Sequence, residues 1–104
     1  MAKIAVRGVR LEALRVLAQR GEQTPGAVAD NLTSEKRSAV YMALQRMEVD
    51  GLVTSWREAK QTLSGSPRRF YTITGLGERA LRLGELAERI EAGEGEIIIE
   101  GGKL

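Results

Sequence analysis

The side chains that most often carry catalysis or bind metals are missing from this chain of 104 residues. It has no histidine and no cysteine, which removes imidazole acid–base chemistry, thiol nucleophiles, thiolate zinc sites and disulfides. Carboxylates such as Asp30, Glu48, Asp50 and Glu58 are present, but no two of them share a recognisable metal or acid–base spacing. The sequence also lacks a glycine-rich phosphate loop. The sequence therefore predicts neither an enzyme nor a bound cofactor or metal.

Hydrogen bonding and charge remain, and suitable side chains recur at helical spacing between residues 34 and 46. With about 100° per residue, the apolar stripe of such a helix centres between Val40 and Met47. The opposite side and its flanks carry Ser34, Arg37, Ser38, Tyr41, Met42, Gln45 and Arg46. Amides pair with adenine, and guanidinium groups pair with guanine or phosphate. This face therefore suits a helix lying against the base edges of DNA, and an ordinary solvated face is the alternative.

A second group of basic residues follows between residues 57 and 69. It contains Arg57, Lys60, Arg68 and Arg69, with Glu58 as its only acid. Each phosphate contact adds about one unit to the salt dependence of DNA binding. We expect this group to set affinity, while the helix sets sequence preference. The alternative is that these side chains only keep the protein in solution.

Charge is distributed unevenly along the chain. Residues 1–84 hold 14 Lys and Arg against 8 Asp and Glu, for a net charge of +6, whereas residues 85–104 hold 2 against 6, for −4. A basic body with an acidic tail favours a polyanion as the partner of the body. No apolar run reaches the roughly 18 residues of a membrane span, and the first residues are too charged for a signal peptide. We therefore expect a cytoplasmic protein that does not contact a membrane.

Three helices are predicted in the first half of the chain. The first runs from about residue 9 to 20 and ends before Gly21, with an apolar stripe of Val9, Leu11, Ala13, Leu14, Val16, Leu17 and Ala18. The second is short and begins at Thr24-Pro25, a capping side chain followed by a proline, with Val28 and Leu32 on one face. The third is expected to be capped by Thr33 or Ser34 and to end near residues 50–51, around Val40, Ala43, Leu44 and Met47.

The pattern then changes to that of strands. Residues 52–58 and 69–73 are rich in β-favouring side chains and predict a hairpin. Their connection, residues 59–68, is long and polar and contains Gly65-Ser66-Pro67, which predicts a projecting loop, or wing. Trp56 and Phe70 are expected to pack the hairpin against the helices.

A final helix is predicted after Thr74, which can cap it, up to Ala92. Its apolar stripe consists of Leu76, Ala80, Leu83, Leu86, Ala87 and Ile90. Three of these residues are spaced by seven, which favours dimerisation through this helix. Packing against the first helix is the alternative explanation.

Residues 93–104 form a separate acidic segment in which Ile97, Ile98 and Ile99 stand between glycines and glutamates. This composition is compatible with a disordered tail or with a short added strand. The expected organisation is one domain over residues 1–92, including the C-terminal helix at about 74–92, followed by this tail.

Three helices, a hairpin with a long loop and a closing helix follow the order of a winged helix-turn-helix domain, which is mainly α with a small β-hairpin. Residues 38–53 resemble the recognition helix of the PadR-like transcriptional regulators, with Tyr-x-x-Leu followed by Leu-Glu-x-x-Gly-Leu-Val, where Met47 replaces the first leucine of the second motif. The resemblance continues through Trp56 and through residues 67–77, which are similar to the family's Pro-Arg-Arg-x-Tyr-x-Leu-Thr-x-x-Gly. It covers about residues 38–81.

The resemblance implies a homodimeric repressor of transcription, with Tyr41 and its neighbours in the major groove of double-stranded DNA and the basic wing residues on the backbone. The chain departs from the family where Pro25-Gly26-Ala27 replaces a usual Gly-Tyr pair, and its last helix is short. Some relatives respond to phenolic or hydrophobic compounds, but the only tryptophan here lies in the predicted wing strand, so no effector is predicted. The rival function is a winged-helix protein-interaction module that does not read DNA and docks through the acidic tail.

Overall fold

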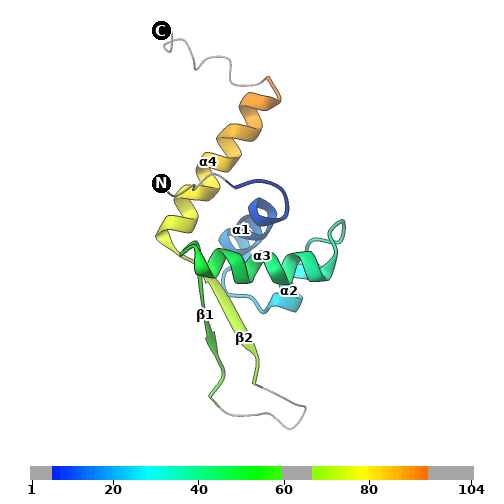
Figure 1. Cartoon of the computed structure of the whole chain (residues 1–104), viewed down its shortest axis with the longest axis vertical. Helices are drawn as coiled ribbons and strands as arrows, with labels where there is room; N and C mark the ends of the chain where they lie inside the picture. Colours follow the sequence, from blue (N-terminus) through cyan, green and yellow to red (C-terminus); the bar gives the residue numbers. More distant parts are fainter. Residues whose placement is uncertain (1–5, 60–66, 94–104) are drawn as a thin grey trace.

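The computed structural model describes residues 6–59 and 67–93 (Figure 1). Its elements are α1 (Gly8–Arg20), α2 (Pro25–Asp30), α3 (Arg37–Val49), β1 (Val53–Arg57), β2 (Arg69–Ile73) and α4 (Gly75–Glu91). The first three helices form a body, the hairpin projects from one end of it, and α4 extends in the opposite direction (Figure 1). The predicted fold class, mainly α with a small hairpin in a winged-helix order, is confirmed.

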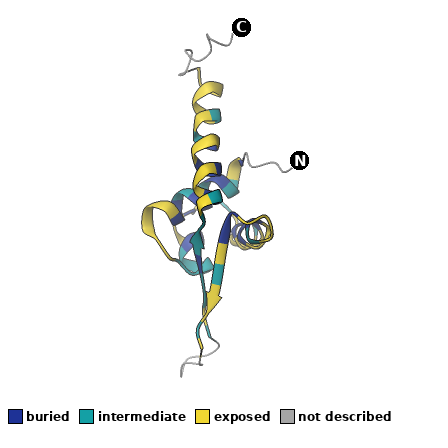
Figure 2. Cartoon of the chain, turned by 90° about the vertical axis from the view of Figure 1, so that its left-hand side faces the viewer, coloured by how far each residue is buried: buried dark blue, intermediate teal, exposed yellow. Residues whose placement is uncertain are grey.

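Helix α1 supplies the centre of the hydrophobic core. Leu11, Leu14 and Leu17 are at most 1% exposed, and they pack with side chains from every other element, among them Val28, Val40, Leu44, Met47, Val53, Tyr71 and Ala80. Ala18 is exposed near the end of α1, although it was predicted to belong to the apolar stripe. Figure 2 shows that burial is concentrated in the body and the first turns of α4, while the far end of α4 is exposed.

The predicted start of α2 is confirmed, and that of α3 is wrong. Thr24 Oγ1 accepts a hydrogen bond from the backbone N–H of Ala27 at 3.1 Å, as expected of the cap. Residues 32–35 instead form a turn in which the N–H of Glu35 donates to the carbonyl of Leu32 at 2.9 Å. Helix α3 therefore begins only after Lys36, whose side chain makes no capping bond. Ser34 precedes the helix and does not lie on its outward face.

The hairpin pairs β1 with β2 in antiparallel register from Val53 opposite Ile73 to Arg57 opposite Arg69. The prediction that Trp56 packs against the helices is only partly correct. Its ring stacks on Phe70 with the two centroids 4.8 Å apart, yet its side chain remains 47% exposed. Its indole N–H reaches the helical body through a hydrogen bond to Glu22. The polar end of the indole thus stays at the surface, where its donor is satisfied.

The corner between α3 and β1 is the point at which α4 joins the fold. The N–H of Thr74 donates to the carbonyl of Leu52 at 3.1 Å. The hydroxyl of Thr74 lies 2.7 Å from the carbonyl oxygen of Gly51 and 3.0 Å from that of Leu52, and it also accepts from the N–H of Gly77. A Cβ at Gly77 would stand 2.0 Å from the carbonyl oxygen of Leu52. Only glycine therefore lets the first turn of α4 approach this corner so closely.

Both explanations of the α4 stripe apply, each to a different part of it. Ala80 is fully buried within the chain, so its assignment to a surface that meets a second copy is wrong. It lies with Gly77, Leu81 and Gly84 on the buried side of the helix. Leu83, Leu86 and Ile90 remain 40–49% exposed, while Leu76 and Ala87 are partly buried. The structure therefore leaves an exposed apolar strip on the outer half of α4.

Ion pairs join the polar side of α4 to α1. Arg15 donates to Glu85 at 3.0 Å and to Glu88 at 3.1 Å, and Arg7 pairs with Glu91. Partial burial disfavours the charged guanidinium, but the bonds to the glutamates outweigh it and raise the pKa of Arg15 above its ordinary value. In the parts of the chain that the structure describes, no helix has the length and apolar content needed to cross a bilayer.

The glycine at the α4 corner gives a direct test of this packing. Gly77→Ala is expected to lower the free energy of unfolding by about 1–3 kcal/mol, because a backbone carbonyl cannot easily move away from the new methyl group. Gly75→Ala is the matched control, since a Cβ at Gly75 would meet no other atom within 4 Å. It should leave stability unchanged or raise it by up to about 1 kcal/mol. Denaturant unfolding of both variants measures the difference, and equal effects would contradict the close packing.

Candidate nucleic-acid interface

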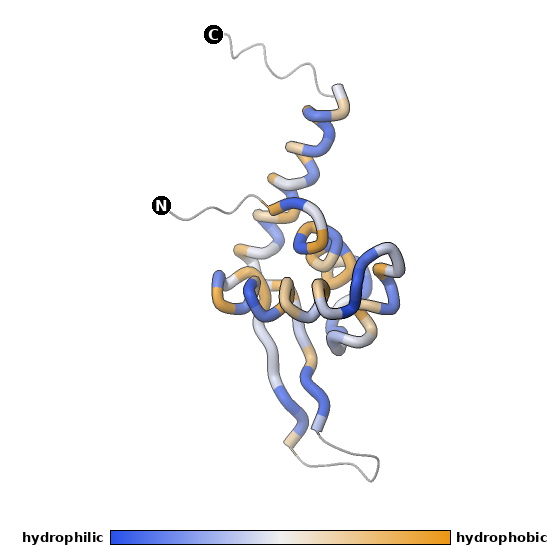
Figure 3. The backbone as a smooth tube through the Cα atoms, turned by 45° about the vertical axis from the view of Figure 1, so that its right-hand side comes forward, coloured by the Kyte–Doolittle hydropathy of each residue, from blue (hydrophilic) through white to orange (hydrophobic). Residues whose placement is uncertain are grey.

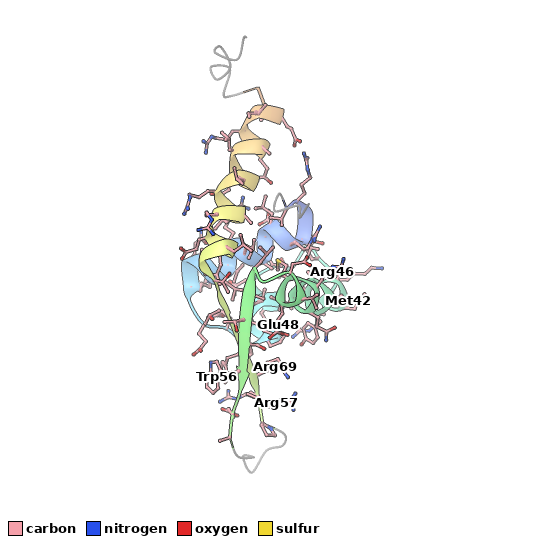
Figure 4. All side chains as sticks on the ribbon, turned by 60° about the vertical axis from the view of Figure 1, so that its left-hand side comes forward. Met42, Arg46, Glu48, Trp56, Arg57 and Arg69 are labelled. Atoms are coloured by element: carbon pink, nitrogen blue, oxygen red, sulfur yellow. The ribbon has the colours of Figure 1, made fainter. Side chains whose placement is uncertain are left out.

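Helix α3 presents one uncharged stripe to solvent. Ser38, Met42, Gln45 and Val49 follow one another at helical spacing and are all exposed, with Met42 at 68%. The opposite side, formed by Val40, Ala43, Leu44 and Met47, is buried as predicted. Met42 and Arg46 both project from the outer side of α3 (Figure 4). In the tube coloured by hydropathy, hydrophilic and hydrophobic positions alternate along this helix (Figure 3).

Arginines flank this stripe, and each lies near a carboxylate. Arg37 Nη1 donates to Asp30 Oδ1 at 2.9 Å, and Arg46 Nε lies 3.7 Å from Asp50 Oδ2, one turn further along α3. The hydrogen bond to Asp30, with a contribution from Tyr41, raises the pKa of Arg37. The charges at the edges of α3 are therefore partly balanced within the protein before any ligand arrives.

Tyr41 and Arg37 both lie against the N-terminal turn of α2. A Cβ at Gly26 would be 3.4 Å from Arg37 Nη2 and 3.6 Å from Tyr41 Oη. Tyr41 keeps 41% of its surface exposed. The sequence departs from the family pattern at Pro25-Gly26-Ala27, and these two side chains thus pack against Gly26 of this segment.

The predicted basic group of the wing divides between the two faces of the hairpin. Arg57 and Arg69 are opposite each other in the register and share one face with Ser55. Arg68 instead lies over the ring of Phe70, with its guanidinium carbon 5.3 Å from the ring centroid, on the other face. The expectation of a single basic group is therefore wrong, because successive residues of a strand point to opposite sides. Lys60, the fourth member, lies outside the described residues.

A chain of hydrogen bonds ties the basic face of the wing to α3. Arg69 Nη1 donates to Ser55 Oγ at 2.7 Å, and the Ser55 hydroxyl donates to Glu48 Oε2 at 2.6 Å. Glu48 belongs to the last turn of α3, so the side chain of Arg69 is oriented by the helix beside it. Arg57 is exposed, and within residues 6–59 and 67–93 it makes no ion pair. Figure 4 shows Arg57 and Arg69 along the hairpin below Glu48.

On the aromatic face, Arg68 is engaged by Glu58. Its guanidinium lies 2.9 Å from Glu58 Oε2, and its backbone N–H donates to Glu58 Oε1 at 3.0 Å. These hydrogen bonds lower the pKa of Glu58. The carboxylate therefore stays ionised at neutral pH and offsets the charge of Arg68.

Sequence reasoning missed the acidic partners of this surface. The four-residue spacing of Arg46 and Asp50 was a usable signal. Asp30 and Glu48 had none, since their partners come from other elements of the fold. Among the described residues, no three acidic side chains are grouped so that they could hold a metal ion.

Helices α2 and α3 form a helix-turn-helix, and α3 exposes its uncharged stripe beside the basic β-hairpin. This arrangement places the protein in the winged helix-turn-helix class. The family model described as the transcriptional regulator PadR-like family matches residues 14–83. The chain therefore belongs to the PadR-like family of transcriptional regulators, which implies DNA-binding regulation.

Solved structures of other regulators share this fold. A PadR family transcription regulator from Clostridium difficile is 20% identical with a TM-score of 0.70, over 82% of this chain and 91% of that one. A PadR family regulator from Eggerthella lenta is 26% identical with a TM-score of 0.66, over 85% and 81%. The zinc-responsive MarR family member ZitR of Lactococcus lactis shares the fold at 17% identity and a TM-score of 0.62, over 96% and 69%. No curated protein matches the chain.

The link between α3 and the wing can be measured with a double-mutant cycle. Glu48→Ala and Arg69→Ala should couple by about 0.5 kcal/mol or more in unfolding free energy, because they share one hydrogen-bond network. The same cycle in a Ser55→Ala background should lose the coupling, since Ser55 connects the two side chains. Additive effects in the unsubstituted background would show that the network does not join the hairpin to the helix.

Proposed function

We propose that this chain is a repressor that binds double-stranded DNA as a homodimer in the cytoplasm, through one domain over residues 1–92. Helix α3 enters the major groove, and the face of the hairpin with Arg57 and Arg69 lies on the phosphate backbone. The observation that carries the proposal is the position of that basic face, hydrogen-bonded to the last turn of α3. An uncharged base-reading stripe and two phosphate-binding arginines are thereby held in one fixed arrangement.

The two parts of this surface have different tasks. Ser38, Met42 and Gln45 occupy the centre of the α3 stripe and reach base edges, with Tyr41 and Arg46 beside them. Gln45 carries an amide that can pair with adenine in the major groove. Arg57 and Arg69 contact phosphates, which fix the register of the protein on the duplex without reading its sequence. Arg37 exchanges Asp30 for a phosphate when DNA arrives, whereas Arg68, on the opposite face of the hairpin, stays paired with Glu58.

The exposed strip on α4 supports a homodimer. Leu83, Leu86 and Ile90 lie on the outer half of a helix that extends away from the body (Figure 1). Exposed apolar side chains gathered on one helix face are typical of a protein–protein contact. A two-fold dimer places two copies of α3 on the same side of a duplex, so its operator is an inverted repeat with half-sites about one helical turn apart.

Repression is the simpler outcome of such binding. A dimer on a promoter blocks transcription by occupying the site, whereas activation needs a further contact with the transcription machinery. The repressor role therefore requires nothing beyond the DNA-binding and dimer surfaces just described.

Substitutions on α3 and the wing should separate sequence preference from general affinity. Selection of the full chain on a random duplex library is expected to yield an inverted repeat. Gln45→Ala should reduce the preference for this operator over a scrambled duplex by about 5–150-fold per half-site, as expected for losing one bidentate base contact in each. Arg57→Ala should weaken binding to both duplexes and lower the salt slope by about one unit per half-site, or about two units for the dimer.

Fluorescence anisotropy with a labelled operator across a salt series measures both effects. Thr54→Ala is a suitable control, because Thr54 is exposed on the opposite face of the same strand as Arg57. If every variant weakens specific and random duplexes equally, α3 does not read sequence. If the library gives no enriched sequence, the proposed function itself is wrong.

The dimer surface has its own test. Leu83→Glu or Ile90→Glu should convert the dimer to a monomer at micromolar concentration, because a carboxylate would be buried without a partner. Arg89→Ala, on an exposed position away from the strip, should leave the assembly unchanged. Sedimentation velocity reports the oligomeric state of all three. A native chain that sediments as a monomer would contradict the homodimer.

A further inference from the structure

Met42 is a large apolar side chain with no place in the core of this protein. It is 68% exposed, whereas the core side of α3 is already filled by Val40, Ala43, Leu44 and Met47. Its neighbours on the outward stripe, Ser38 one turn before and Gln45 one turn after, are polar. An isolated exposed methionine is common on protein surfaces. Met42 differs from such a residue because it lies at the centre of a candidate base-reading stripe, where it can contact a base.

The length of the stripe matches a short run of base pairs. From Ser38 to Gln45 the helix rises roughly 10 Å at about 1.5 Å per residue. This equals about three base-pair steps of roughly 3.4 Å each. Ser38 and Gln45 can therefore face the first and last of four successive pairs, with Met42 over one of the two pairs between them. Residues in the N-terminal part of a recognition helix are the ones that reach base edges, which favours Met42 over Val49 at the far end.

The charges beside Met42 are partly balanced within the protein. Of the arginines on either side of it in sequence, Arg37 is hydrogen-bonded to Asp30, and Arg46 lies 3.7 Å from Asp50. Recognition of guanine in the major groove commonly uses a guanidinium group that is available to the base. Here the centre of the helix offers a thioether, a hydroxyl and an amide instead.

The chemistry of the major groove then indicates what Met42 can recognise. A thioether side chain forms only weak hydrogen bonds, so Met42 gains most from an apolar partner. The C5-methyl group of thymine is the apolar group that an unmodified base pair presents in the major groove. The amide of Gln45 is suited to adenine N6 and N7, which is consistent with A·T pairs under this part of α3.

We propose that Met42 is a specificity-determining residue that contacts the C5-methyl group of a thymine, so that each operator half-site carries an A·T pair beneath the middle of α3. This inference rests on the proposed function, because it requires α3 to lie in the major groove. The same methyl group is also present on 5-methylcytosine, and the experiment distinguishes the two bases.

The test removes one methyl group at a time from the operator that library selection yields for the full chain. Each thymine of a half-site is replaced by deoxyuridine, which keeps every base-pair hydrogen bond. Wild-type protein should lose about fourfold in affinity per half-site at one such position, the ratio that corresponds to about 0.8 kcal/mol for one buried methyl group. Met42→Ala should bind thymine and uracil operators equally. Met42→Leu, which keeps an apolar side chain of similar size, should restore the preference for thymine.

Val49→Ala is the matched control, because Val49 is an exposed apolar residue on the same stripe but at the end of α3. It should keep the full preference for thymine, and circular dichroism of each variant verifies that the helix is intact. A C·G pair at the sensitive position should bind weakly, and 5-methylcytosine should restore only part of the affinity, because the exchanged pair still presents different hydrogen-bonding groups in the major groove.

Three results would overturn the inference. A flat uracil scan on an enriched operator would show that no thymine methyl is read, while leaving the proposed function in place. Persistence of the thymine preference in Met42→Ala would assign the contact to another residue. Equal binding of 5-methylcytosine and thymine operators would show that the methyl group is read without regard to the base pair that carries it.

Discussion

The carbonyl group of Leu52 holds the three functional elements of this protein in one arrangement. It stands at the corner between α3 and β1, it accepts the N–H of Thr74 where β2 ends, and the first turn of α4 lies directly on it because Gly77 has no side chain. The end of α3, the base of the hairpin and the start of α4 therefore cannot move independently. A positive φ of 83° at Gly51 lets the chain reverse at this corner. The candidate DNA surface and α4, which carries the exposed strip, are in this way joined at one corner.

The candidate surface also shows how a basic protein can limit its own attraction to polyanions. Arg37, Arg46 and Arg68 each have a carboxylate partner at the surface, and such exposed pairs add little to stability. They do keep the arginine side chains oriented and reduce the net charge that a random phosphate backbone would meet. A DNA duplex must therefore offer contacts that are more favourable than these ion pairs within the protein. A duplex of the right sequence can do this through base contacts with α3.

The fold could largely be predicted from the sequence, because helix periodicity, the Thr24 and Thr74 caps and the β-favouring runs all act locally. The errors arose where the outcome depends on partners from elsewhere in the fold. Ser34 falls in a turn because Leu32 is buried and its carbonyl is bonded to the N–H of Glu35. Ala80 faces the body because the glycines beside it allow α4 to approach closely. Arg68 and Arg69 point to opposite faces because they are successive residues of a strand. Which of them shares a face with Arg57 depends on the register, which a long connecting loop leaves undetermined in the sequence.

The aromatic residues that absorb near 280 nm are distributed unequally over this architecture. The chain has one tryptophan and two tyrosines. Trp56 is stacked on Phe70 in the hairpin, Tyr71 is buried at the base of the same hairpin, and Tyr41 lies on α3. Tryptophan emission from the unlabelled protein thus comes from the hairpin alone, where Glu22 is bonded to the indole and Arg68 lies over the ring stacked on it. The intrinsic optical signal is an internal reporter of the wing, and it can follow the wing in solution without any added dye.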